Sequence, residues 1–529
     1  MSVKLEYAKM PVPRRRFLQG AGAVAATTAL AAPGSRAFAQ SGSGFRMRSY
    51  SDLRTYDPSF SAGVPDGELQ NLVFVSLIGY KPGRVWEWKL DGAAEMEQTD
   101  PTHIRFALRD DIGFGDGFGA VTAEDVKFSF ERVADPALES NNAPDWEQLD
   151  EVQVTGERTG VIALKKAFPP LWLTTLTNYT GIIVSKRAVE ALDGKRMATE
   201  PVAQSGPYRL KSWTPRQSSS FVRNPDWAGE RYDFDTIDVF PIDDEATAEI
   251  AFEAGEIDFT RVSLASVERL RTSPPAGATL DEYPSLFYVW LGMNVEHPKL
   301  RSRELRQAIQ YAIDVPTILE AAYFGAVEPS TGIIAPGLTG NRPAGMIAPE
   351  ANLERARELL EASGETGVSL TLNVINKTDF TTAAQVIQAN LAGIGIDVEI
   401  IVNDSGTFWA LGDENAGDAW QDLQLVMNRF SMRPDPSYAT TWFTQEQVGV
   451  WNWERFRSEE FDRLHNAAAT ESDVARRDEM YRKAQDLMEE SGAYRFITHE
   501  ATPVIYASDR VVPALRPDGL PLLRDFRRA

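Results

Sequence analysis

The clearest hydrophobic pattern in the chain lies within residues 349–402. Apolar residues recur at helical spacing from position 353 to 360, and the pattern stops at Gly364, a residue type that often ends helices. Apolar and polar residues alternate over 368–374 and again over 396–402, and a second helical pattern over 380–391 separates them. The order strand, helix, strand predicts a right-handed unit of two parallel strands, so this part of the chain is expected to be α/β.

Other segments have weaker patterns. A helix is predicted after Thr122, which is followed three positions later by Asp125, as in a capping box with Asp in place of Glu or Gln. Another is predicted to begin at Ser302. Residues 205–260 look rich in strands and turns. This change in character along the chain predicts two lobes with a ligand cleft between them, near the carboxyl ends of the parallel strands.

The N-terminal residues have the features of an export signal. Three arginines and Phe-Leu at positions 14–18 precede an apolar run over 20–32, and alanines at 37 and 39 form a cleavage site. The apolar run is too short to span a bilayer. We therefore predict that residues 1–39 are a twin-arginine-type signal peptide, and that the mature protein is periplasmic, soluble and without a direct membrane anchor.

Composition narrows the function. The net charge of -22 argues against nucleic acid as a partner, since phosphates require a basic surface. The chain has no cysteine and only four histidines, so we expect no metal and no cofactor. The sequence motifs of common hydrolases and nucleotide-binding enzymes are missing, so we predict that the protein is not an enzyme. A secreted hydrolase, a ligand sensor and a chaperone stay as alternatives.

Several short motifs together resemble a known family. Each is weak alone, but their order and spacing are similar to those of the extracellular solute-binding proteins of the dipeptide, oligopeptide and nickel class, known as family 5. These binding proteins serve ABC importers. The resemblance covers about residues 45–510, and the motifs that carry it lie at residues 56–58, 106–126, 205–208, 224–227, 255–258 and 303–314.

The resemblance implies a two-lobe periplasmic-binding-protein clamp of type II, in its large form with an extra subdomain. It also implies a monomer that captures a small ligand and delivers it to a permease at the inner membrane, which works with a cytosolic ATPase. The expected parts are a discontinuous lobe 1 (40–82, 202–292 and 498–529), its extra subdomain (83–201) and an α/β lobe 2 (293–497).

One departure from the family concerns the ligand. Peptide-binding relatives carry an Asp that pairs with the ammonium group of the peptide, in a loop ending in an acidic residue and Pro. Asp435 aligns with that acidic residue, and the anchoring position then falls at Met432. Arg429 and Arg433 flank the site and suit a carboxylate or phosphate, which predicts an anionic ligand such as a sugar acid or opine. Two alternatives stay open: Arg433 pairs with Asp435 while Arg429 points to solvent, or Asp435 itself takes the ammonium of a peptide.

Aromatic residues are the remaining candidates for the site. Tyr288 and Trp290 lie in a strand expected to cross between the lobes, with either one face toward the cleft or both faces buried. Trp409, Trp451 and Trp453 offer stacking surface for a sugar ring or an apolar side chain, although a tryptophan more often belongs to the core.

Overall fold

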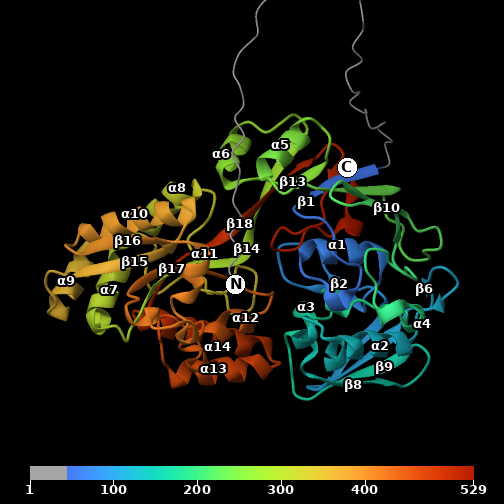
Figure 1. Ribbon diagram of the computed structural model, residues 1–529, viewed down its shortest axis with the longest axis horizontal. Coiled ribbons are helices and arrows are strands. Elements are labelled where there is room, and N and C mark those ends of the chain that lie inside the picture. The colour runs from blue at the N-terminus through green and yellow to red at the C-terminus, as the bar shows by residue number, and fades with distance from the viewer. Residues whose placement is uncertain (1–43) are drawn as a thin grey trace, which may run out of the picture. The chain divides into compact units, whose positions relative to one another are not determined.

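The computed structural model describes residues 44–529, which belong to a single unit (Figure 1). The predicted signal peptide, residues 1–39, lies outside the described residues. Over the described part of the chain, no helix has the length and apolar character needed to cross a membrane.

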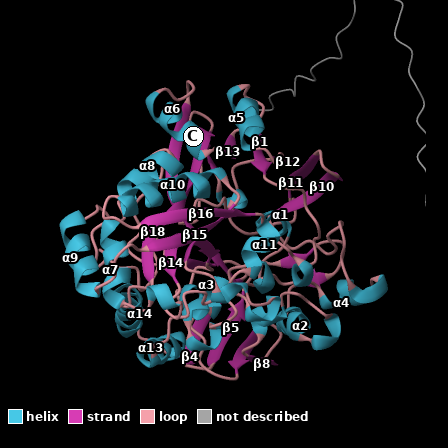
Figure 2. Ribbon diagram, turned by 60° about the vertical axis from the view of Figure 1, so that its left-hand side comes forward, coloured by secondary structure: helices cyan, strands magenta, loops and turns pink. Residues whose placement is uncertain are grey.

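A ten-stranded mixed sheet runs through the described chain (Figures 1 and 2). The pairs β1–β12, β1–β13, β15–β16 and β15–β17 are parallel, and the other neighbours are antiparallel. In spatial order the strands are β10 (Tyr208–Thr214), β11 (Ser218–Arg223), β12 (Thr236–Pro241), β1 (Gly44–Ser49), β13 (Phe259–Arg261), β18 (Tyr494–Ala507), β14 (Ala278–Met293), β17 (Leu425–Ser431), β15 (Ser369–Ile375) and β16 (Asp397–Asn403).

The two longest strands, β14 and β18, join the two halves of this sheet. Their antiparallel pairing changes register between Pro284 and Tyr288, so the ladder is irregular at mid-length. At one end β18 pairs with β13 of predicted lobe 1, and at the other β14 pairs with β17 of predicted lobe 2. The expectation that the strand containing Tyr288 crosses between the lobes agrees with this topology.

The predicted strand–helix–strand unit is confirmed. It consists of β15, α10 (Thr378–Ala392) and β16, and the two strands pair in parallel along their whole lengths. The preceding helix, α9 (Leu353–Ser363), ends at Gly364, whose φ of 72° lies in the left-handed region that favours glycine. One large apolar cluster fills the space between these strands and helices α7 (Arg303–Ala312), α8 (Val315–Tyr323) and α10.

A second sheet lies within the predicted subdomain, residues 83–201. Its four antiparallel strands are ordered β4 (Ala93–Asp100), β5 (His103–Leu108), β9 (Thr159–Leu164) and β8 (Leu149–Val154), and α2 (Ala123–Ala134) packs against it over a separate apolar cluster. The capping box at the start of α2 is confirmed, since Thr122 and Asp125 bond each other's backbone N–H groups. The limits of the lobes and of the subdomain stay predictions.

The helix predicted from Ser302 is also confirmed, because the Ser302 side chain accepts a hydrogen bond from the Leu305 backbone at the start of α7. The remaining helices are α1 (Val64–Val73), α3 (Leu171–Thr174), α4 (Lys186–Glu190), α5 (Glu245–Glu253), α6 (Leu264–Thr272), α11 (Ser405–Ala410), α12 (Ser437–Thr440), α13 (Glu459–Thr470) and α14 (Val474–Glu490). The remaining strands are β2 (Ile78–Tyr80), β3 (Trp88–Leu90), β6 (Gly113–Phe114), β7 (Gly119–Ala120), β19 (Val511–Val512) and β20 (Arg527–Arg528).

Candidate functional site

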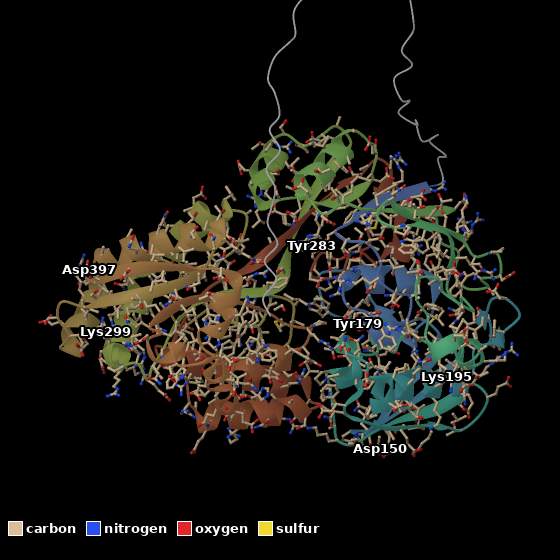
Figure 3. The ribbon with its side chains drawn as sticks, in the orientation of Figure 1. Asp150, Tyr179, Lys195, Tyr283, Lys299 and Asp397 are labelled. Carbon is tan, nitrogen blue, oxygen red and sulfur yellow. The ribbon has the colours of Figure 1, made fainter. Side chains whose placement is uncertain are left out.

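One cavity of the described chain has a volume of about 980 Å³, at the upper end of the range for small-molecule sites. Its walls come from segments that are far apart in the sequence. One lining residue is Tyr179, which belongs to the predicted subdomain (Figure 3). Other lining segments belong to predicted lobe 1 and lobe 2. They include α1, β13, the middle of β14, the end of β17, the middle of β18 and the C-terminal residues 516–525.

Strand alternation decides which side chains of β14 face the cavity. Successive side chains of a strand point to opposite faces. Phe287 lines the cavity and is 36% exposed, whereas Tyr288 and Trp290 are 1% and 0% exposed. Their rings stack with centroids 5.4 Å apart, and Trp290 Nε1 donates a hydrogen bond to Glu454 Oε1 at 2.7 Å. The structure therefore places Tyr288 and Trp290 in the core behind the cavity, and it is the opposite face of β14 that reaches the cavity, at Phe287.

Arg429 lines the cavity but is not free to bind an anion. Its Nη2 donates a hydrogen bond to Glu500 Oε2 at 2.6 Å, and its Nε bonds the other carboxylate oxygen. The guanidinium carbon also lies 3.6 Å from the centre of the Phe287 ring. The alternative in which Arg429 points to solvent is wrong, because this side chain is held on the cavity wall from two sides.

Arg433 and Asp435 have separate partners. Arg433 lines the cavity and pairs with Asp145 of the predicted subdomain. Asp435 is 4% exposed and accepts two hydrogen bonds from Arg477 Nη2, both at 2.8 Å. The proposed Arg433–Asp435 pair is therefore wrong, and the Asp435 carboxylate already has a buried cationic partner. Met432, at the anchoring position, lines the cavity with an apolar side chain.

The predicted tryptophans fall into two groups. Trp453 is 2% exposed and belongs to the core of the α/β part, so it offers no open face. Trp409 and Trp451 are 38% and 37% exposed. Both rings contact Phe430, with centroid distances of 6.3 and 5.8 Å. Trp409 and Trp451 are not among the residues that line the 980 Å³ cavity, and their role in binding stays a prediction.

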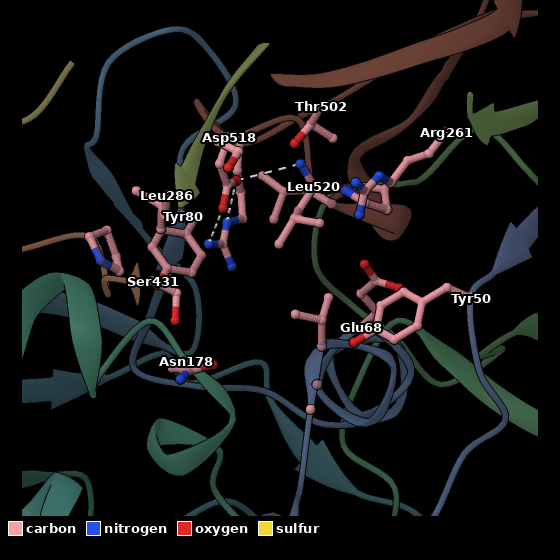
Figure 4. Close-up of a pocket in the computed structure, with 18 of the residues that line it drawn as sticks. Tyr50, Glu68, Tyr80, Asn178, Arg261, Leu286, Ser431, Thr502, Asp518 and Leu520 are labelled. Atoms are coloured by element: carbon pink, nitrogen blue, oxygen red, sulfur yellow. Dashed lines mark hydrogen bonds and ion pairs between the residues drawn. The ribbon is translucent and has the colours of Figure 1, made fainter. Parts of the chain in front are cut away.

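Several charged residues of the cavity were not expected from the sequence. Arg516 pairs with Asp518, with Nη2 2.8 Å from Oδ2 (Figure 4). Glu68 on α1 and Arg261 on β13 also line the cavity, and Figure 4 shows their side chains pointing toward the same region. Burial raises the pKa of Glu68 to about 8, because loss of hydration outweighs the opposing effect of the nearby Arg516 and Arg261 guanidinium groups. No pattern in the sequence marks either position.

Within residues 44–529, no three His, Asp or Glu side chains are arranged so that they could hold a metal ion.

Comparison with known proteins agrees with the fold. The model of "Bacterial extracellular solute-binding proteins, family 5 Middle" matches residues 88–449, more than half of the chain. The probable D,D-dipeptide-binding periplasmic protein DdpA of Escherichia coli K12 is 25% identical over 460 residues, covering 84% of this chain and 86% of the relative. The glutathione-binding protein GsiB of Shigella flexneri serotype 5b is 24% identical over 396 residues, covering 72% and 74%.

Solved structures are similar over nearly the whole described chain. HbpA2 from Haemophilus parasuis has a TM-score of 0.81 at 21% identity, covering 92% of this chain and all of that one. The unliganded open form of the murein tripeptide binding protein MppA has a TM-score of 0.78 at 20% identity, covering 92% and 97%. Together with the family match, these findings confirm the predicted clamp fold, and the chain belongs to family 5 of the bacterial extracellular solute-binding proteins.

Proposed function

We propose that this protein binds a short peptide or peptide-like solute in the 980 Å³ cavity and delivers it to an ABC importer. It acts in the periplasm as a monomer and partners a permease that works with a cytosolic ATPase. The observation that carries the proposal is the cavity itself, whose walls come from both predicted lobes and which is large enough for a ligand of two or three residues. The relatives named for D,D-dipeptides and glutathione support the ligand class.

The state of the two arginines favours a peptide over an anionic sugar or opine. An anion bound to Arg429 or Arg433 would have to compete with Glu500 or Asp145, each already joined to its arginine. These two neutralised arginines therefore offer such a ligand little net attraction.

Thermal-shift measurements test this proposal directly. The purified protein is heated with dipeptides, tripeptides, glutathione, anionic sugars and opines in turn. A ligand present at 100 times its dissociation constant stabilises the folded state by about 2.7 kcal/mol, a rise of several degrees at most in a protein of this size. We expect stabilisation by peptides and unchanged peptide after incubation, as judged by mass spectrometry. Stabilisation by anionic sugars alone, or cleavage of the peptide, would contradict the proposal.

A further inference from the structure

One acidic and one basic side chain of the cavity have no hydrogen-bond or ion-pair partner within the described chain. In the described chain, no hydrogen bond or ion pair is formed by the Glu68 carboxylate, and none by the Arg261 guanidinium, whose Nε is buried. Their carboxylate and guanidinium groups influence each other electrostatically without being joined. Figure 4 shows the two side chains extending toward each other from α1 and β13, with Tyr50 beside Glu68.

The other arginines of the cavity are all neutralised or bonded. Arg524 pairs with Asp91 at 2.9 Å, and Arg516 pairs with Asp518. Arg48 donates hydrogen bonds to the backbone carbonyls of residues 242 and 243. Arg429 and Arg433 have the carboxylate partners described above. Among the cavity arginines of the described chain, Arg261 is therefore the one whose guanidinium group has no partner.

Glu68 also differs from Asp243, another cavity carboxylate that lacks a partner. Asp243 is exposed, so water can solvate its charge. Glu68 is partly buried, and the groups that face it are Arg516 and Arg261, which favour its charged form, and Asp518, which opposes it. A carboxylate without a cationic partner in such surroundings is costly, and a bound ammonium group would remove that cost.

We propose that the ligand is a zwitterion, whose ammonium group binds Glu68 and whose carboxylate binds Arg261. This inference rests on the proposed function and specifies its ligand: a short peptide or amino-acid derivative with both ends free. A guanidinium group bonds a carboxylate through two parallel N–H donors, which makes Arg261 suited to the acidic end. The ammonium anchor is thus moved from the loop at Met432, which is apolar in this chain, to helix α1.

Isothermal titration calorimetry with a matched set of peptides tests the assignment. The set holds one dipeptide with free ends, its N-acetyl form and its C-terminal amide. For the unaltered protein we expect each blocked form to bind at least tenfold more weakly than the free dipeptide. Glu68→Gln should bind the free and N-acetyl forms alike, and Arg261→Gln should bind the free and amide forms alike. Glu361→Gln, which changes an exposed carboxylate of α9 outside the cavity lining, is the control and should leave all affinities unchanged.

Proton release gives an independent readout. Because the pKa of Glu68 is about 8, the group is mostly protonated at pH 7, and binding of an ammonium group should displace close to one proton. Titration at pH 7 in two buffers of different ionisation enthalpy measures this release, which Glu68→Gln should abolish. Equal release by the variant and the unaltered protein would overturn the assignment, as would equal discrimination among the three peptides. Failure of every peptide to bind the unaltered protein would instead refute the proposed function.

Discussion

Arg429 and Glu500 form a two-point ion pair on the wall of the cavity, with Nη2 2.6 Å from Oε2. The pair joins β17 to β18 across β14, and the Phe287 side chain of β14 packs on the guanidinium group at 3.6 Å. The side chains of three neighbouring strands are thereby locked together on the cavity wall. The pair thus serves first to shape the wall and to balance its charge.

Replacing one member of this pair should lower the stability of the protein more than replacing both. In Arg429→Gln, the Glu500 carboxylate loses its partner while only 17% of its side chain is exposed, so the variant should melt at a lower temperature than the unaltered protein. The double variant Arg429→Gln, Glu500→Gln should recover about 1 to 2 kcal/mol of that loss, because no charge is left unpaired. Thermal unfolding of the unaltered protein, the two single variants Arg429→Gln and Glu500→Gln, and the double variant at pH 7 measures the coupling. Additive effects of the two substitutions would contradict the structural role of the pair.

The buried pair of Asp435 and Arg477 should matter for stability and not for the choice of ligand. Asp435→Asn leaves the buried Arg477 charge with neutral partners only, and we expect the free energy of unfolding to fall by about 3 to 5 kcal/mol. The exposed pair of Glu460 and Arg463 is the control, and Glu460→Gln should change stability little. Calorimetry at a temperature where Asp435→Asn is still folded should show peptide affinity within about twofold of the unaltered protein. A specific loss of affinity for free-amine peptides would restore Asp435 as the anchor.

The contrast between these pairs shows what the sequence could reveal. Residues 368–402 were predicted correctly because the spacing of apolar residues within short segments is enough to predict the two strands and the helix of the α/β unit. The partner of Arg433 lies 288 positions away, on a different part of the fold. No local pattern distinguishes that partner, Asp145, from the other acidic residues of the chain. Sequence proximity therefore suggested Asp435, which is in fact bound by Arg477.

Glu68 and Arg261 escaped prediction for a similar reason. These two residues are candidates for ligand binding because they have no partner in the protein. The lack of a partner can be recognised only when the positions of all neighbouring side chains are known. The alternation of β14 did allow a correct set of alternatives for Tyr288 and Trp290. Choosing between them required the elements that cover the strand, including Phe430 and Phe443, which pack on the Trp290 ring.

The buried Glu454 should make stability depend on pH. Burial raises its pKa to about 7, although Trp290 Nε1 donates a hydrogen bond to it. The folded state therefore holds a proton that the unfolded chain releases above its ordinary pKa of about 4.5, so the free energy of unfolding falls as pH rises from about 4.5 to 7. Between pH 5 and pH 8, the free energy of unfolding should fall less in Glu454→Gln than in the unaltered protein, by up to about 3 kcal/mol. Melting temperatures of both proteins at the two pH values test this, and identical pH dependences would contradict it.

The exposed rings of Trp409 and Trp451 lead to a prediction about apolar ligand side chains. Both rings rest on Phe430, whose strand neighbours Arg429 and Ser431 line the cavity. Because each tryptophan is more than a third exposed, replacement by Ala should lower the melting temperature only slightly. If the rings stack on a bound side chain, each replacement should weaken binding of a peptide with an aromatic residue by about fivefold to tenfold, and binding of an alanine peptide much less. Trp453→Ala, which opens a hole in the α/β core, should instead destabilise the protein without this selectivity. Equal losses for the aromatic and alanine peptides would remove Trp409 and Trp451 from the site, and the aromatic side chain would then have to be held within the 980 Å³ cavity alone.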